Sequence, residues 1–206
     1  YISDRRGANE IWLYDPVKKK EKILVGAKNN PLIDYIPTDG HALSISPDGK
    51  YLAFIGEKNK KDFIALYDII SSAITIYHPP IENLKSISSP SFFPDGKKII
   101  FSAMKGCFRD LYVYNTDNNS VAQLTNDNFD DTDPVVSPDG KYIIYVSERQ
   151  KGQNLWDYDL FAMDISGTSG KVARLTDWEW DERTPVISRS GKILAFRAEP
   201  YETRNI

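Results

Sequence analysis

The chain has 206 residues, of which 41% are hydrophobic and 12% aromatic, and its formal net charge is −3. A chain of this length and composition can bury a substantial core, while its interspersed charges lack the clustered lysine and arginine of a nucleic-acid-binding protein. No apolar run is long enough to span a bilayer, so membrane insertion is not expected, and the single cysteine, Cys107, excludes an internal disulfide.

Short apolar runs bounded by turn residues follow one another along the whole chain. Such runs predict β-strands. Taken in chain order, strands are expected over residues 1–3, 10–15, 43–46, 51–55, 63–67, 73–76, 99–101, 111–114, 121–124, 134–137, 142–146, 160–163, 172–175 and 193–196.

A Pro-Asp-Gly turn recurs between these strands, at residues 47–49, 94–96 and 138–140, with a degenerate fourth copy at 188–192. Proline presets φ at the second turn position, and glycine accepts the positive φ that closes a tight hairpin. The four glycines lie 47, 44 and 51 residues apart, and an aromatic residue stands five positions after each. A repeat of this period suits one four-stranded unit.

Each repeat contains the same four kinds of strand. The strand after the turn is apolar throughout and should be covered on both faces. The next strand alternates, and the last is shorter and more polar, as expected at a sheet edge. The sequence therefore predicts an all-β protein, a β-propeller of four-stranded antiparallel blades.

About four blades' worth of sequence is present. We interpret the chain as a single propeller domain or propeller fragment, and we favour a piece of a larger, six- to eight-bladed propeller. The alternative is a closed four-bladed ring, in which the last two strands complete the first blade. The repeat units are 1–38, 39–85, 86–129, 130–180 and, in part, 181–206.

Three segments resemble the TolB-like, WD-repeat-like propeller family. Residues 3–15 resemble its loop-and-strand signature, and residues 124–141 resemble its blade junction, of which residues 175–192 are a weaker copy. The resemblance implies a protein-binding propeller like the periplasmic TolB proteins, exported in a bacterium to the periplasm or secreted. The resemblance is also compatible with an alternative function, the substrate-gating propeller domain of a prolyl-oligopeptidase-type serine peptidase.

Residues that carry chemistry are scarce. His41 and His78 are too few for a zinc site of the common kind, and both are expected at the surface. There is no Gly-x-Ser-x-Gly elbow, and residues 167–171 lack the full phosphate-loop pattern. We therefore expect no catalytic residues, no metal and no cofactor in this chain, and a polysaccharide-acting propeller would need more channel histidines.

One face of the predicted propeller is acidic. Loops after second strands and loops between blades should emerge at the same end of an antiparallel meander, and carboxylates recur there at the entrance to three of the four first strands. Tryptophans lie farther out. The predicted binding residues are Asp39, Asp130, Asp131, Asp181, Glu182, Trp156, Trp178 and Trp180.

Two interpretations of these acids remain open. In the first they are structural, hydrogen-bonding backbone amides and stiffening the blade junctions. Alternatively they form an acidic ring for a basic peptide segment or a cation, with a tryptophan as anchor. Because Trp178 and Trp180 alternate, at most one is expected to face a partner.

Overall fold

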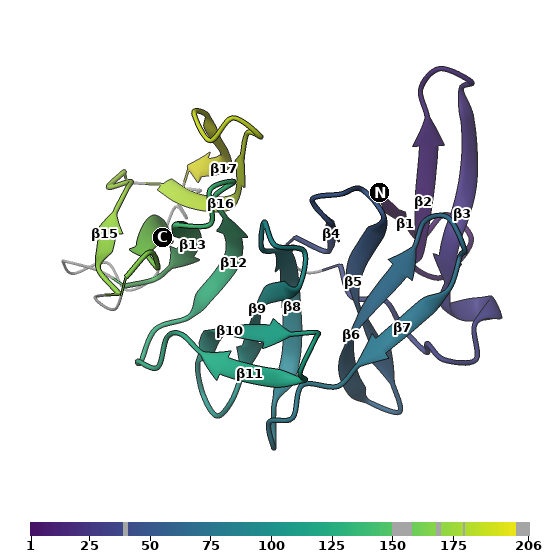
Figure 1. The fold of residues 1–206 in the computed structure, drawn as a ribbon, viewed down its shortest axis with the longest axis horizontal. Coiled ribbons are helices and arrows are strands. Elements are labelled where there is room, and N and C mark those ends of the chain that lie inside the picture. Colours follow the sequence, from purple (N-terminus) through teal and green to yellow (C-terminus); the bar gives the residue numbers. More distant parts are fainter. Residues whose placement is uncertain (39–40, 150–157, 168–169, 179, 201–206) are drawn as a thin grey trace, which may run out of the picture.

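The computed structural model describes residues 1–38, 41–149, 158–167, 170–178 and 180–200. In these ranges the chain forms five antiparallel sheets that follow one another along a curved row (Figure 1). In chain order we call them sheets A (β1–β3), B (β4–β7), C (β8–β11), D (β12–β15) and E (β16–β17). The predicted all-β architecture of four-stranded meanders is confirmed.

The elements have the following bounds. Sheet A contains β1 (Ile2–Ser3), β2 (Glu10–Asp15) and β3 (Lys20–Gly26), followed by a short 3₁₀ helix η1 (Ala27–Asn29). Sheet B contains β4 (Leu43–Ile45), β5 (Tyr51–Lys58), β6 (Lys61–Asp68) and β7 (Ile74–Tyr77). Sheet C contains β8 (Lys85–Phe92), β9 (Lys98–Met104), β10 (Arg109–Asn115) and β11 (Ser120–Gln123). Sheet D contains β12 (Asp131–Val136), β13 (Tyr142–Ser147), β14 (Asp159–Asp164) and β15 (Val172–Arg174), and sheet E contains β16 (Trp180–Ile187) and β17 (Leu194–Pro200).

All four predicted turns form, including the degenerate one. In each, the glycine N–H donates to the carbonyl three residues earlier, and the glycine φ lies between 69° and 74°. Successive turns also stack. A Cβ added to Gly96 would lie 3.9 Å from Pro47, and one added to Gly140 would lie 3.6 Å from Pro94, so each glycine rests on the proline of the preceding blade.

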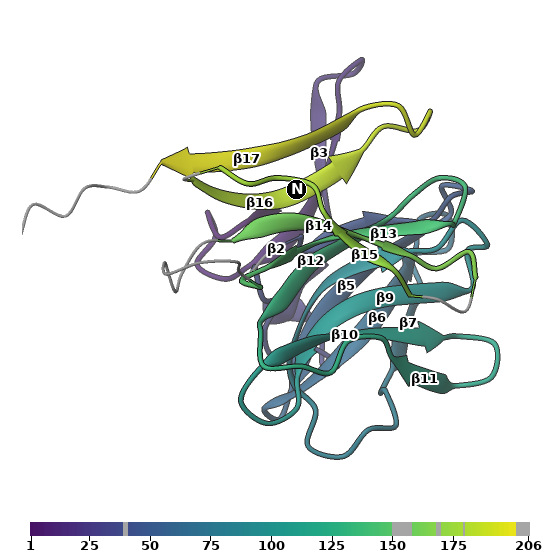
Figure 2. The same ribbon diagram turned by 90° about the vertical axis from the view of Figure 1, so that its left-hand side faces the viewer.

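The strands that follow the Pro-Asp-Gly turns of sheets B, C and D are buried on both faces, as predicted. Along β5, Leu52 and Phe54 join the core between sheets A and B, whereas Ala53 and Ile55 join the core between sheets B and C. A third core of the same kind lies between sheets C and D. Blade-on-blade stacking therefore supplies the hydrophobic stabilisation of the fold. In Figure 2, which looks along the row, the sheets lie one behind another.

The last repeat departs from this pattern. The run 193–196 was predicted to be covered on both faces, but Ile193 is 65% exposed and precedes β17. The prediction is wrong here because β17 pairs only with β16, and sheet E is the last sheet of the row, so no further described sheet packs on it beyond sheet D. Nor does β17 pair with β1 in the part of the chain that the structure describes, so the four-bladed ring does not close.

The first strand of sheet D begins earlier than predicted. β12 starts at Asp131 instead of residue 134, because residues on both sides of a β-bulge pair with β13. The bulge contains Asp133 at a φ of 48°, and the equivalent residue of β16, Thr184, has a φ of 50°. Asp131, Asp181 and Glu182 consequently lie inside strands and not in the loops that precede them.

Candidate functional site

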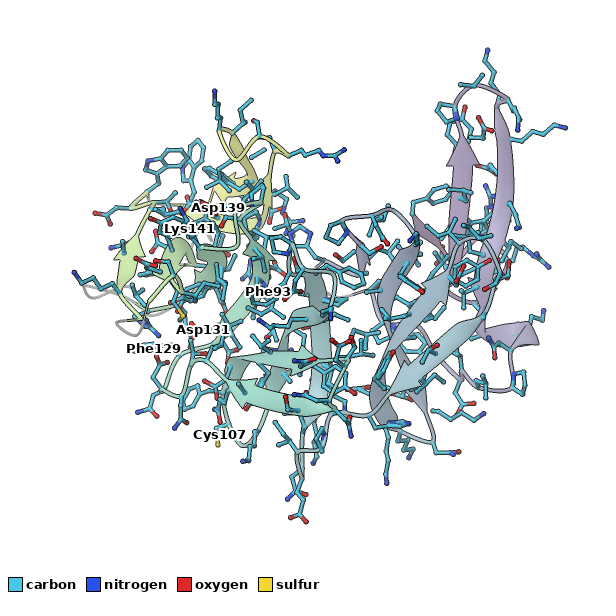
Figure 3. The ribbon with its side chains drawn as sticks, in the orientation of Figure 1. Phe93, Cys107, Phe129, Asp131, Asp139 and Lys141 are labelled. Atoms are coloured by element: carbon cyan, nitrogen blue, oxygen red, sulfur yellow. The ribbon has the colours of Figure 1, made fainter. Side chains whose placement is uncertain are left out.

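The connections from second to third strands meet the connections between sheets at one end of the molecule, as predicted. We call this end the loop face and the end with the Pro-Asp-Gly turns the turn face. Figure 3 shows Cys107, in the β9–β10 connection of the loop face, far from Asp139 and Lys141 of a turn. Three backbone N–H groups donate to carboxylates across the loop face: Ile87 to Asp62 at 3.0 Å, Arg109 to Asp130 at 2.8 Å and Tyr158 to Asp181 at 3.2 Å.

Two of the predicted acids, Asp130 and Asp181, therefore join neighbouring elements of this face. Both side chains are half-buried. The backbone of Asp130 also contacts Glu148, whose N–H donates to the Asp130 carbonyl at 3.4 Å. Asp62 of the third strand of sheet B, which was not among the predicted residues, accepts the Ile87 N–H of sheet C in the same way.

Asp131 lies beneath this surface and is 0% exposed. Burial raises its pKa to about 6, although the hydroxyls of Ser147 and Thr125 and the guanidinium of Arg149 oppose the rise. The Arg149 Nη2 atom is 3.6 Å from the Asp131 carboxylate and also pairs with Asp127. Asp131 is thus a buried member of an ionic cluster between sheets C and D.

Glu182 occupies the equivalent position at the next junction and is also 0% exposed. Burial raises its pKa to about 7, and the nearby carboxylates of Asp159 and Asp181 add to the rise. A carboxyl group in this environment is largely protonated well above the pH at which glutamate normally ionises.

The two junctions share a construction that the sequence analysis did not single out. A threonine after the fourth strand accepts a backbone N–H of the third strand at 2.9 Å, from Leu111 to Thr125 and from Leu160 to Thr176. Each threonine hydroxyl also lies 3.4 Å from a buried aspartate. These aspartates are Asp110 and Asp159, and burial raises the pKa of both. The Leu-Thr pair that repeats at residues 124–125 and 175–176 is the sequence signal that could have revealed them.

The innermost strands are joined by a chain of hydrogen bonds that runs from sheet B to sheet E. The His41 N–H donates to Ser89 Oγ at 3.2 Å, and Ser89 Oγ donates to Asp133 at 2.7 Å. The other oxygen of Asp133 accepts the Thr184 N–H at 3.3 Å. His41 is half-buried at this hub, whereas His78 is exposed as expected. The hub fixes the blades relative to one another.

The two described tryptophans of the predicted site lie together. Trp178 is 53% exposed and Trp180 is 46% exposed, and their ring centroids are 6.4 Å apart. Trp178 also packs on Phe196, with centroids 5.6 Å apart. Strand alternation does not separate the two rings because β16 begins only at Trp180.

The remaining predicted residues, Asp39 and Trp156, lie outside the described residues. Within the described ranges, no group of three or more histidine, cysteine, aspartate or glutamate side chains is arranged to hold a metal ion. Those ranges also contain no helix of the length and apolarity needed to cross a membrane.

Comparison with known proteins gives one family match. The profile of the TolB beta propeller domain matches residues 40–206. In structure, the chain is similar to TolB from Acinetobacter baumannii, with 27% sequence identity and a TM-score of 0.72, covering 94% of this chain and 44% of that protein.

Two relatives are similar in sequence. The uncharacterized protein Atu1656 of Agrobacterium fabrum is 28% identical, over 74% of this chain. The uncharacterized peptidase YuxL of Bacillus subtilis is 24% identical, over 77% of this chain. The chain spans only 48% of the first relative and 29% of the second.

Proposed function

The chain belongs to the TolB β-propeller family, and we propose that it is a non-enzymatic binding module that presents the loops of one face to a protein or peptide partner. The observation that carries this proposal is the contrast between the two faces. On the turn face, short turns stack on one another, whereas the loop face carries connections between sheets, such as residues 78–84 and 124–130, and hydrogen bonds to Asp62, Asp130 and Asp181.

A rigid scaffold with exposed loops suits protein recognition. The hub fixes the blades relative to one another, and a scaffold preorganised in this way favours affinity. Trp178 and Trp180 add exposed aromatic surface next to Asp181, and tryptophan is enriched among the residues that dominate interface energies. We propose a bacterial protein of the periplasm or the extracellular space.

The single cysteine offers a direct test of the binding face. Cys107 is exposed on the loop face, so a thiol-directed photo-cross-linker can be attached there without any substitution. We expect cross-links to a discrete partner in envelope extracts. The matched control moves the thiol to the turn face, as Cys107→Ser with Lys141→Cys, and should give no such product. Equal labelling from both positions would contradict the proposal.

The charge of the partner can be tested at the same face. Asp130→Asn with Asp181→Asn keeps an oxygen that can accept the backbone N–H groups but removes both charges. If the acids attract a basic segment of the partner, this variant should lose cross-linked product while melting at an unchanged temperature. A lower melting temperature with product retained would instead assign the two acids to junction stability.

A second function is favoured by one relative. Because YuxL is named a peptidase and matches over 29% of its own length, the chain is alternatively a substrate-gating propeller domain of a serine peptidase. The coding sequence that flanks residues 1–206 distinguishes the two. A downstream α/β-hydrolase pattern with a nucleophile elbow would favour the peptidase, and an upstream export signal with a small α/β domain would favour the TolB-like protein.

A further inference from the structure

The loop face contains a groove between sheets B and C that the sequence analysis did not identify. Its volume is about 970 Å³, at the upper end of the range typical of ligand pockets. The β5–β6 hairpin forms one wall, and the β7–β8 connection, residues 78–84, forms the other (Figure 1). The start of β8 and Arg109 of β10 also line it.

The walls of this groove are preformed. Ile81 and Leu84 of the β7–β8 connection pack against the core between sheets B and C. The Ile81 N–H donates to the Pro79 carbonyl at 2.8 Å, which closes a tight turn. On the opposite side, Tyr35 pairs with Glu57 as an isolated β-bridge. A ligand would therefore meet walls that need little further ordering.

Cations whose charge is not balanced by an ion pair line the groove. Four lining side chains are cationic: Lys60, Lys61, Lys85 and Arg109. In the described part of the chain, no ion pair joins any of these four side chains to a carboxylate. Of the three lining acids, Glu57, Asp62 and Glu82, Asp62 already accepts the Ile87 N–H. The lining thus carries one more positive than negative group in a chain whose net charge is −3.

Arg109 is held in place within this lining. Its Nη1 atom donates to the Ser86 carbonyl at 2.8 Å and lies 3.3 Å from Ser88 Oγ. Both acceptors are neutral, so they orient the guanidinium without compensating its charge. A guanidinium fixed in this way presents its remaining N–H donors in the planar arrangement that matches a carboxylate.

From the charge, the preformed walls and the mixed lining, we propose that this groove binds an acidic peptide segment of the partner protein. Arg109 and Lys85 receive its carboxylates, and Tyr35, Ile81 and Leu84 contact its apolar side chains. The groove is too large for a lone anion, and its apolar residues would gain nothing from one. This inference rests on the proposed function, because it names the segment that the loop face would bind.

The test uses a fluorescently labelled short peptide in which aspartate alternates with leucine, and a counterpart in which asparagine replaces aspartate. We expect the acidic peptide to bind the 206-residue chain, with an affinity that falls as salt is added, and the neutral peptide to bind much more weakly. The variant Lys60→Glu with Lys85→Glu should weaken acidic-peptide binding by roughly tenfold or more. Arg109→Lys should weaken it severalfold while keeping the charge.

The matched control reverses two lysines of the turn face, Lys19→Glu with Lys192→Glu, and so makes the same change in net charge. It should leave acidic-peptide binding nearly unchanged. Equal binding of the acidic and neutral peptides, equal weakening in both double variants, or no binding at all would overturn the inference. If any of these results is found while Cys107 on the loop face still cross-links to a partner, the proposed function remains supported. Absence of cross-linking from Cys107 would refute the proposed function itself.

Discussion

At the scale of single residues, Gly56 packs tightly against the ring of Phe63. These residues face each other across β5 and β6, and a Cβ added to Gly56 would lie 2.4 Å from the Phe63 ring. Phe63 is 0% exposed and belongs to the core between sheets A and B. Only glycine leaves room for this ring.

We therefore expect Gly56→Ala to lower the free energy of unfolding by about 1–3 kcal/mol, since an overpacked core forces side chains or backbone to shift. Chemical denaturation measures this change. Gly167→Ala is the matched control, because no atom lies within 4 Å of a Cβ added to Gly167. A Gly56→Ala protein as stable as this control would show that the Phe63 ring can move aside freely.

Glu182 predicts a pH dependence of stability. Its pKa is raised to about 7 in the folded chain from an ordinary value of 4.5, so the folded state binds the proton more tightly than the unfolded state. The stabilisation that this proton gives is complete below pH 4.5 and is lost as the pH rises through about 7.

Glu182→Gln should remove this dependence. At pH 8 the variant should be more stable than the parent chain, by up to about 3 kcal/mol, and the difference should disappear near pH 4.5. Denaturation midpoints of both proteins measured across this pH range provide the check. Parallel pH profiles for the two proteins would mean that Glu182 ionises as an ordinary surface glutamate.

At the scale of elements, the Pro-Asp-Gly hairpins combine a local turn with a contact to the next blade. Gly140 has a φ of 72°, and a Cβ added there would lie 3.6 Å from Pro94 of the preceding turn. Asp139 Oδ1 accepts the Ser137 hydroxyl at 2.6 Å and the Lys141 N–H at 3.1 Å. The turn is thus fixed both by its own hydrogen bonds and by its neighbour.

A series at Gly140 separates these contributions. Gly140→Ala should cost about 1–2 kcal/mol of stability, because a Cβ disfavours the left-handed conformation. Gly140→Asn should cost less, since asparagine tolerates that conformation, and Gly140→Val should cost most. Thermal melting of the three variants gives the order. An order that followed side-chain size alone would show that the contact with Pro94 outweighs the backbone conformation.

At the scale of the whole molecule, stability should fall from the middle of the row of sheets toward its ends. Strands β5 and β9 have a neighbouring sheet on both faces, whereas β17 alternates half-buried and exposed side chains. Local opening is easiest where few apolar contacts must be broken.

Hydrogen exchange of the 206-residue chain should therefore be slowest in β5 and β9 and fastest, among the described strands, in sheet E. Mass spectrometry of proteolytic fragments resolves these regions. Protection of β17 equal to that of β9 would indicate that another surface covers the outer side of sheet E in solution.

The sequence alone determined the repeat, the turns and the radial stacking of the blades. Those features depend on local chemistry and periodicity: glycine at the turn position that needs a positive φ, and unbroken apolar runs such as residues 51–55. The same periodicity predicted that connections after second strands and connections between sheets emerge at one end, because strand direction in a meander alternates. The backbone N–H groups that donate to Asp62, Asp130 and Asp181 lie at that end.

Only the tertiary structure decided what the acidic residues of that face contact. Asp130 and Asp131 are neighbours in sequence, yet one accepts a backbone N–H near the surface and the other is fully buried beside Arg149, because Asp130 ends the connection that leads into sheet D whereas Asp131 begins the packed strand β12. The groove between sheets B and C was likewise hidden from the sequence, since Lys60, Lys85 and Arg109 come from three separate places in the chain, the β5–β6 connection, the start of β8 and the start of β10. Side-chain burial and the joining of distant loops arise from the packing of one blade on the next, and no local pattern encodes them.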